Sequence, residues 1–390
     1  MKYDVVIIGA GPAGLSCTRS LHALGLKVAL VEKMPVDALR NPLADGREIA
    51  LTHLSKHILE ELGVWQAIPQ SGIANIDRAR VLDGNSSWFM EFDNNMPDGQ
   101  PLGHIVSNHL IRRALFDGVE KLDNVTLYCG NAIRSIHRDY HLATVTFDDG
   151  RRLDATLLVA ADSRVSPCRR MVGIGASMRD TGHTIIVCRM QIEKPHNGIA
   201  FECFHYGGTL AILPLPGKEI SAVITVHNEE VTELLARDED KFNEAIGRRF
   251  NQRLGSMHIC SKPVSYPLTL VHADQYSKRR IALVGDAAVG MHPVTAHGFN
   301  LGLRGQNTLA GIIDGALLNQ RDIGAADLLA DYGRRHRRIV TPLYTATNNL
   351  VRLYTNDSFP ARLARKVVLQ AGNRIKPIRQ RIVQQLMEKV

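Results

Sequence analysis

The sequence predicts an α/β fold: a Rossmann-like nucleotide-binding domain, an inserted and mainly antiparallel β-sheet domain, and a helical C-terminal segment. Three observations support this prediction. The chain opens with a strand, a glycine-rich turn and a helix, the way in which Rossmann-like domains begin. Its middle contains short β-branched runs separated by turns. Beyond Asn300 nearly the whole chain has the apolar spacing of helices.

The first strand and helix enclose a dinucleotide-binding fingerprint. After the apolar run at 5–8, Gly9, Gly11 and Gly14 form GxGxxG ahead of a helical stretch at 15–24. Such glycines allow a tight turn, close approach of the backbone to a pyrophosphate and close packing of helix on strand, while the helix N-terminus attracts negative charge. A second apolar run, 27–32, ends at Glu32, whose carboxylate can accept hydrogen bonds from both ribose hydroxyls of an adenosine.

The fingerprint alone leaves the ligand open. An acid at Glu32 repels a 2′-phosphate, so NADP is disfavoured, but FAD and NAD both fit. A glycine turn in some other α/β fold is the structural alternative, and the spacing to Glu32 argues against it.

A second group of residues, 282–303, favours FAD. A buried strand ends at Gly285-Asp286, His292-Pro293 follows, and residues 298–300 open a helix. A flavin can use both features, because Asp286 can hold ribityl hydroxyls and a helix N-terminus can stabilise negative charge on the reduced ring. A nicotinamide has no obvious use for both.

The strand pattern gives the domain boundaries. The FAD-binding domain is predicted to be discontinuous, with residues 1–72, 101–172 and 277–330. The β-sheet substrate domain takes 73–100 and 173–276, and the basic helical C-terminal segment takes 331–390. Strands are expected at 88–92, 125–129, 142–147, 155–160, 185–192, 199–206, 210–213, 220–226 and 281–284, and a hairpin turn at 214–217.

Composition and charge exclude several classes. The chain has 390 residues, 45% of them hydrophobic, and no apolar run long enough to span a membrane. Six scattered cysteines form no CxxC pair, so no metal site is expected and a reducing cytoplasm is indicated. The net charge is +8, and residues 331–390 carry 13 Lys and Arg against 3 Asp and Glu, which leaves the rest of the chain at about −2.

The C-terminal segment contains two amphipathic helical patterns, one over 363–371 and one over 378–390 after Pro377. Their apolar faces can pack on the body of the protein or lie on a membrane, where their basic faces would meet anionic headgroups. Docking to other proteins is a further alternative. Nucleic acid binding is disfavoured, because aromatic residues do not alternate with the basic ones.

These motifs together resemble the FAD-dependent aromatic hydroxylases of the para-hydroxybenzoate hydroxylase type. The glycine turn, the Ala161-Asp162 segment and the stretch from Asp286 to Leu303 carry the resemblance. Within that family the chain is most similar to the ring hydroxylases of ubiquinone biosynthesis, in particular short bacterial members of the demethoxyubiquinol hydroxylase kind, through Gly63-Val64-Trp65 and the arginine-rich tail. The resemblance implies these cofactor-binding residues: Gly9, Gly11, Gly14, Glu32, Lys33, Arg47, Asn108, Asp162, Asp286, Gly298, Phe299 and Asn300.

The chain departs from the family pattern at three places. Asp162-Ser163 stands where the family usually has Asp-Gly, Ala296-His297-Gly298 where it has Gly-Gln-Gly, and Leu303-Arg304-Gly305 where it has Leu-Arg-Asp. The first departure affects a segment said to contact both FAD and NAD(P)H. The second places an ionisable imidazole beside the flavin.

The resemblance also implies a reaction. FAD and dioxygen would hydroxylate the ring of a prenylated phenol or quinol through a flavin C4a-hydroperoxide, with NAD(P)H or another donor supplying electrons. Pro293 would lie near the reactive flavin edge, and His292 or His297 would accept a phenolic proton. Each histidine has the structural alternative of satisfying a loop carbonyl.

Two other functions compete with hydroxylation. A reductive flavoenzyme of the geranylgeranyl reductase type shares the FAD framework, and a non-catalytic flavoprotein subunit of a quinone-biosynthesis assembly would explain the departures. A cytoplasmic location is expected, either free or peripheral on the inner membrane.

Overall fold

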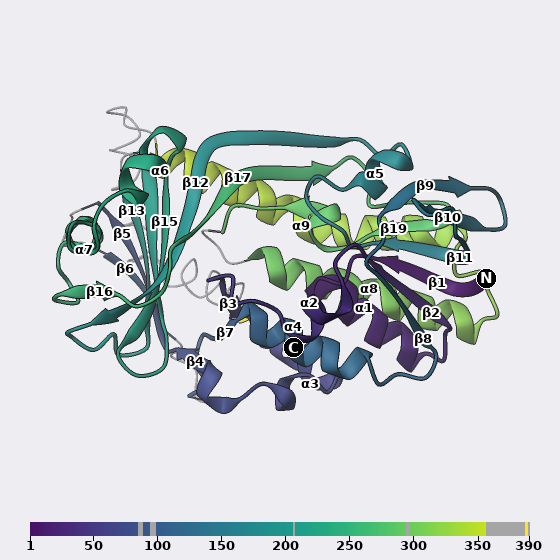
Figure 1. Ribbon diagram of the computed structural model, residues 1–390, viewed down its shortest axis with the longest axis horizontal. Helices are drawn as coiled ribbons and strands as arrows, with labels where there is room; N and C mark the ends of the chain where they lie inside the picture. The colour runs from purple at the N-terminus through teal and green to yellow at the C-terminus, as the bar shows by residue number, and fades with distance from the viewer. Residues whose placement is uncertain (85–88, 94–98, 206, 294–296, 356–386, 389–390) are drawn as a thin grey trace.

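The computed structural model describes residues 1–84, 89–93, 99–205, 207–293, 297–355 and 387–388. Two large β-sheets lie at opposite ends of the molecule, and long strands and one long helix run between them (Figure 1). This arrangement confirms the predicted α/β fold with a Rossmann-like part and a mainly antiparallel sheet.

The first sheet contains the parallel strands of the Rossmann-like part. β19, β11, β1, β2 and β8 run parallel in that order, because β1 pairs with β11 on one side and β2 on the other. β18 joins antiparallel at one edge, and β10 and β9 continue from β11 as a hairpin. The strands are β1 (Lys2–Ile8), β2 (Val28–Glu32), β8 (Val125–Cys129), β9 (Ile133–Arg138), β10 (Ala143–Phe147), β11 (Arg152–Ala160), β18 (Ser277–Lys278) and β19 (Ile281–Leu283).

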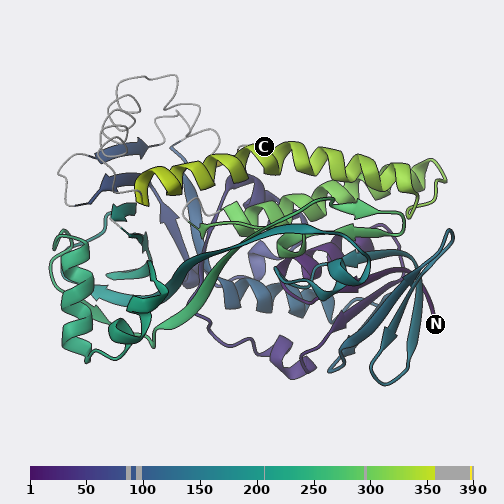
Figure 2. The same ribbon diagram turned by 90° about the horizontal axis from the view of Figure 1, so that it is seen from above.

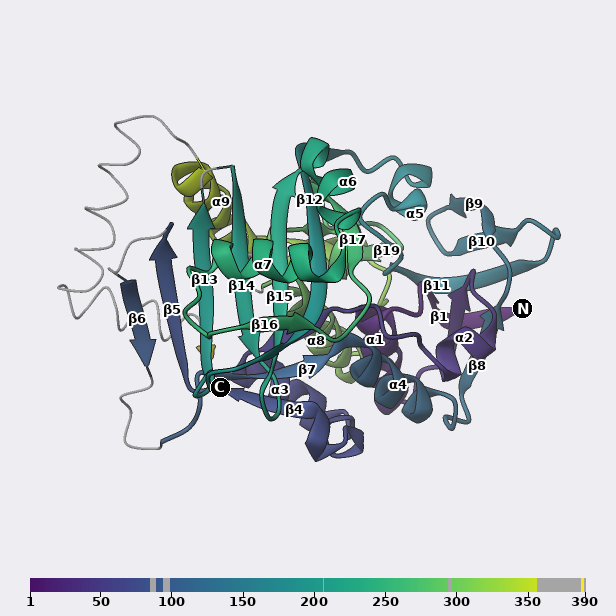
Figure 3. The same cartoon turned by 60° about the vertical axis from the view of Figure 1, so that its left-hand side comes forward.

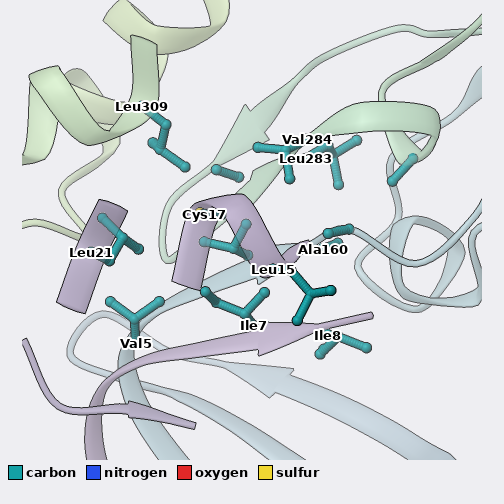
Figure 4. Packing of buried hydrophobic residues seen from close by; sticks show 14 of the residues in the cluster. Val5, Ile7, Ile8, Leu15, Cys17, Leu21, Ala160, Leu283, Val284 and Leu309 are labelled. Carbon is teal, nitrogen blue, oxygen red and sulfur yellow. The ribbon is translucent and has the colours of Figure 1, made fainter. Parts of the chain in front are cut away.

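Helices cover this sheet and bury its apolar strands. Leu15, Cys17 and Leu21 of α1 face Val5 and Ile7 of β1 in a fully buried cluster (Figure 4). α1 also packs against α4 and α8. The helices of this part are α1 (Pro12–Ala23), α2 (Val36–Arg40), α3 (His53–Glu61), α4 (Asn108–Val119), α5 (Pro167–Met171) and α8 (His297–Leu318), with short 3-10 turns at Trp65–Ala67, Gln70–Gly72 and Gly285–Ala287.

The second sheet has nine strands and is antiparallel apart from the pairing of β13 with β5. Its outer face is covered by α7 (Glu239–Arg249), which lies in front of the sheet in Figure 3, and α6 (Asn228–Leu235) lies at one end of it. The strands are β5 (Arg78–Asp83), β6 (Phe89–Asp93), β12 (Ala176–Ile192), β13 (Ile199–His205), β14 (Gly208–Pro214), β15 (Glu219–His227), β16 (Met257–Ile259), β17 (Val264–Ala273) and β20 (Val289–Gly290). The predicted hairpin at 214–217 joins β14 and β15.

A small sheet lies between the two large ones. It contains β3 (Glu48–Leu51), β7 (Gly103–Ser107) and β4 (Ile73–Ile76). Glu48 on β3 receives hydrogen bonds from Nε and Nη2 of Arg189 on β12, at 3.0 and 2.7 Å. This ion pair fixes the small sheet against the nine-stranded sheet.

Helix α9 (Ala326–Thr355) runs along both large sheets (Figure 2). Val340 and Leu343 belong to the core of the Rossmann-like part, whereas Leu350 packs in a cluster with Phe204 of β13. Pro342 lies inside this helix, within the stretch that packs on the Rossmann-like core and ahead of Leu350.

The C-terminal helices predicted at 363–371 and 378–390 lie outside the described residues, apart from Met387 and Glu388. Met387 is buried beside Phe204, and the Glu388 carboxylate accepts hydrogen bonds from Thr52 Oγ1 at 3.1 Å and Arg304 Nη1 at 2.8 Å. Among the described residues, the structure shows no helix long and apolar enough to cross a membrane.

Candidate active site

The glycine turn after β1 leaves room for a ligand at one position only. A Cβ on Gly9, where φ is +107°, would collide with the carbonyl oxygen of Ala161, and a Cβ on Gly14 would collide with that of Gly9. A Cβ on Gly11 would meet no atom within 4 Å in the part of the chain that the structure describes. Gly11 is also the N-cap of α1, and no side chain caps this helix end. The exposed amides and the open space therefore suit a pyrophosphate.

Glu32 is held next to this turn at the end of β2. Its Oε2 accepts a hydrogen bond from the Ala10 amide at 2.8 Å, and its Oε1 accepts one from the Met34 amide at 3.1 Å. These bonds fix the carboxylate beside the glycine turn, where the ribose of a dinucleotide would lie. Lys33 follows with an exposed side chain.

Arg47 and Asn108 both donate hydrogen bonds to the carboxylate of Asp45. Arg47 Nε donates to Asp45 Oδ2 at 2.9 Å, and Asn108 Nδ2 donates to the same oxygen at 2.7 Å. Burial raises the pKa of the Asp45 carboxyl, but the hydrogen bonds from Arg47 and Asn108 outweigh burial and hold it below its usual value. The guanidinium of Arg47 also lies 5.6 Å from the ring centre of Tyr266, whose hydroxyl donates to the Asp45 carbonyl at 2.6 Å.

Two loops that follow neighbouring parallel strands carry Asp162 and Asp286. Asp162, after β11, accepts hydrogen bonds from Ser166 Oγ at 2.6 Å and from the Cys168 amide at 3.2 Å, so its carboxylate organises the start of α5. Asp286, after β19, forms an ion pair with Arg164 at 2.8 Å and keeps 43% of its side chain exposed. Asp286 is therefore accessible to a ligand, while Asp162 shapes the loop.

The N-terminal turn of α8 is fixed by buried hydrogen bonds. Asn300 Oδ1 accepts from the Thr52 amide at 3.2 Å, and its Nδ2 donates to the Ala50 carbonyl at 2.9 Å. Phe299 is half-buried, and a Cβ on Gly298 would meet no described atom within 4 Å. The start of α8 thus has a rigid frame with open space at Gly298, which suits a planar ring system.

His292, Pro293 and His297 flank the residues 294–296. His292 and His297 are buried, and Pro293 is exposed. Burial, reinforced by the nearby charges of His183 and Arg164, lowers the pKa of His292 to about 4. The imidazole of His292 is therefore neutral at pH 7, and its lowered pKa makes it a weak base.

A cavity of about 70 Å³ adjoins His292 and lies on the inner face of the nine-stranded sheet. Its walls come from β12, β14, β15, β17 and α9: Arg179, Thr181, His183, Gly208, Thr209, Thr225, Leu268, Leu270, Asn348, Val351 and Arg352. Since a cavity of about 150 Å³ holds a benzene molecule, these walls must move apart to admit an aromatic ring.

Sequence reasoning missed several of these residues. Asp45, Tyr266 and Arg164 have no motif of their own, and each reaches its partner only through the fold. The cavity-lining threonines are ordinary strand residues in the sequence. Only strand alternation, once the sheet order is known, places Thr209 and Thr225 on one face.

The residues present fit FAD: an uncapped helix N-terminus with open space at Gly11, a fixed carboxylate at Glu32, an accessible Asp286 and a rigid α8 N-terminus. They define an FAD-dependent enzyme. The family model described as "FAD binding domain" matches residues 2–347, and the chain belongs to that family.

Relatives with named functions show which kind of FAD-dependent enzyme the chain resembles. The chain is 42% identical to "Ubiquinone hydroxylase UbiM" of Neisseria meningitidis over 99% of this chain and 85% of the relative. It is 35% identical to "Ubiquinone hydroxylase UbiL" of Rhodospirillum rubrum, over 98% and 89% respectively. The crystal structure of the p-nitrophenol 4-monooxygenase PnpA from Pseudomonas putida has a TM-score of 0.78 at 16% identity and 99% coverage of both chains, a likeness of fold. The resemblance to ubiquinone-biosynthesis hydroxylases is confirmed, and the chain is an FAD-dependent monooxygenase.

Proposed function

We propose that this monooxygenase hydroxylates the aromatic ring of a prenylated ubiquinone precursor. The observation that carries the proposal is the cavity between the inner face of the nine-stranded sheet and His292, because it adjoins the segment that leads into α8. The names of the relatives UbiM and UbiL supply the substrate class. This reading is favoured over an alkene reductase and over a non-catalytic subunit.

The protein's part in such a reaction is binding, orientation and proton handling. Bound FAD, once reduced, supplies the activation of dioxygen. Gly11 and the α1 N-terminus would bind its pyrophosphate, Glu32 its adenosine ribose, and Asp286 its ribityl chain. Arg47, Asn108, Gly298, Phe299 and Asn300 would bound the space of its ring system.

Activation of the substrate hydroxyl would fall to His292. A neutral imidazole beside the cavity can accept a hydrogen bond from the phenolic hydroxyl at a ring nitrogen, which raises the electron density of the aromatic ring and makes it a better nucleophile. Pro293, next in the chain, would help to position the ring, and His297 is a second acceptor at the start of α8. The electron donor is proposed to be NAD(P)H or another reductant.

The test is oxygen incorporation. The purified protein with bound FAD is expected to consume dioxygen in the presence of a donor and a prenylated phenol, and to place one atom of ¹⁸O₂ in the ring, detected by mass spectrometry. Alkene reduction without oxygen incorporation would indicate the reductase function instead. A yellow protein that oxidises no donor, with or without lipid, would indicate a non-catalytic subunit. In cells lacking the protein, the mass of the accumulated quinone precursor identifies the missing oxygen.

We further propose that the basic C-terminal segment contacts an anionic membrane surface, where a polyprenyl substrate resides. In α9, Tyr332 and His336 are buried, whereas Arg334, Arg335, Arg337 and Arg338 are exposed. The apolar side of this part of α9 thus packs on the body and its basic side faces solvent, which suits lipid headgroups. Sedimentation with phosphatidylglycerol vesicles is expected to exceed that with phosphatidylcholine vesicles, and to fall when the four arginines are changed to glutamine. Equal sedimentation with both lipids would contradict the proposal.

A further inference from the structure

Glu202 directs a carboxyl group toward the inner face of the nine-stranded sheet. Its neighbours along β13, Phe201 and Cys203, belong to the core that α7 covers on the outer face. Because side chains alternate along a strand, Glu202 points the opposite way. An acid therefore lies on the face of the sheet that lines the cavity.

Thr209 connects Glu202 to the cavity. Leu210, next to Thr209 on β14, packs in the outer core, so Thr209 shares the inner face with Glu202. Thr209 is 4% exposed and lines the cavity, and its hydroxyl donates to Thr225 Oγ1 at 3.3 Å and also lies next to the Glu202 carboxyl. The carboxyl group thus lies directly beside the cavity wall.

One oxygen of Glu202 has no partner. Its Oε1 is buried and makes no hydrogen bond among the residues that the structure describes. The positions that flank Glu202 in register are Val81 on β5 and Ala211 on β14, neither of which offers a polar side chain. Burial raises the pKa of the Glu202 carboxyl well above its usual value. An unsatisfied buried carboxyl oxygen destabilises a fold, and a partner that enters the cavity would remove this cost.

We propose that Glu202 is a substrate-binding residue whose Oε1 hydrogen-bonds a ring hydroxyl of the substrate. The inference rests on the proposed function, because a phenol or quinol ring brings the required hydroxyl. A hydroxyl can donate to an ionised or carbonyl oxygen and can accept from a protonated one, so it satisfies Oε1 in either state of the carboxyl. The walls that must separate to admit the ring include Thr209, which would bring the ring to Glu202.

The test compares two ring compounds that differ by one hydroxyl group. 2-Allylphenol and allylbenzene are titrated into the FAD-loaded protein, and binding is measured by calorimetry and by the change in the flavin spectrum. The wild-type protein is expected to bind 2-allylphenol at least about tenfold more tightly, because the hydrogen bond to a buried carboxyl is lost with allylbenzene. Glu202→Leu is expected to bind both compounds equally. Glu202→Gln, whose amide can still form a hydrogen bond, should retain part of the preference.

Stability separates substrate binding from a structural role. If Oε1 forms a hydrogen bond only when substrate is bound, Glu202→Leu should unfold at the same temperature as the wild type or at a higher one. The reason is that the substitution removes an unsatisfied buried group. The matched control is Glu91→Leu on β6 of the same sheet, where the carboxylate is already bound by Arg80 Nε at 2.5 Å. This control should keep the wild-type preference for the phenol.

Two results would overturn the inference. One is an unchanged phenol preference in Glu202→Leu, which would assign Glu202 to the fold if both Glu202 variants also unfold at a lower temperature. The other is a wild-type protein that binds both compounds equally well. If the wild type binds neither compound, the proposed substrate class fails as well. If 2-allylphenol binds with the same affinity to the wild type and to the Glu202 variants, the role of Glu202 is contradicted but the proposed function is not.

Discussion

The Arg164 guanidinium holds the Asp286 carboxylate at 2.8 Å, although 122 positions separate the two residues in the chain. The pair joins the loop after β11 to the turn after β19, and these two strands are neighbours in the parallel sheet. The aliphatic part of Arg164 also packs against Gly290, where a Cβ would lie 3.1 Å from Arg164 Cδ. Arg164 thus supports the segment on which Asp286 and His292 lie.

Removing each member of this pair should affect FAD binding to a different extent. Asp286→Ala removes a group that would contact FAD, so we expect the dissociation constant for FAD to rise about tenfold or more. Arg164→Gln removes only a partly exposed ion pair, worth about 0–1 kcal/mol, so the rise should stay below about fivefold. Quenching of flavin fluorescence during titration of the apoprotein measures both constants. A larger effect of Arg164→Gln than of Asp286→Ala would show that Arg164 itself binds the cofactor.

The glycine turn predicts opposite results for two similar substitutions. Gly14→Ala should destabilise the protein by roughly 1–3 kcal/mol, because its Cβ collides with the Gly9 carbonyl. Gly11→Ala should leave the apoprotein as stable as the wild type, since its Cβ enters open space, yet weaken FAD binding because that space is needed for the pyrophosphate. Thermal unfolding of the apoprotein and FAD titration distinguish the two. Unchanged FAD affinity in Gly11→Ala would place the pyrophosphate elsewhere.

Buried histidines should make the protein sensitive to acid. Burial lowers the pKa of His336 to about 4, and neither ring nitrogen has a hydrogen-bond partner among the described residues. A histidine whose pKa falls on folding stabilises the fold above its unfolded pKa of about 6.5, and this contribution is lost as the pH falls from there to about 4. The loss for His336 is roughly 3 kcal/mol. His104 and His292, also lowered to about 4, should add to it.

His336→Leu is expected to reduce this loss of stability, measured by urea unfolding at pH 7 and pH 4.5. The partly exposed His57, which lies 3.3 Å from a Glu61 carboxylate oxygen, offers the control, as His57→Leu removes an imidazole that the core does not enclose. If His336→Leu and the wild type lose the same free energy of unfolding between these two pH values, the buried imidazole is not the cause.

His297 stands where the family has glutamine, and His297→Gln tests whether the imidazole is needed. We expect this variant to bind FAD normally and to retain most of its turnover, because His292 remains beside the cavity as a hydrogen-bond acceptor for the substrate hydroxyl. The measurement is the hydroxylation rate together with the FAD content of the purified variant. Complete loss of hydroxylation with FAD still bound would make His297 the essential base.

Most of the fold follows from local patterns in the sequence, and the exceptions have physical causes. The strand predicted at 185–192 is the end of β12, which begins at Ala176. Its first part is mostly polar and contains Gly182, so its own pattern does not indicate a strand. Pairing of residues 176–180 with β17 creates it.

The candidate site likewise contains residues that local sequence patterns predict and residues that only the fold brings together. The glycine turn, Glu32 and the α8 N-terminus are recognisable because their chemistry requires a fixed spacing along the chain. Asp45 and Tyr266, or Arg164 and Asp286, are partners brought together by sheet order, which no local spacing encodes. Glu202 shows the limit most clearly: alternation predicts that it points away from Phe201, but only the position of α7 shows which face is covered.

The proline inside α9 bears on how the cavity can open. Pro342 offers no N–H for a helical hydrogen bond, so the backbone there resists bending less than elsewhere in this long helix. The part of α9 up to Tyr344 is anchored in the Rossmann-like core, with Val340 and Leu343 on either side of the proline, while Asn348, Val351 and Arg352 further along form one wall of the cavity. Admission of an aromatic ring would then need a movement of the turns of α9 after Tyr344, with both sheets remaining intact.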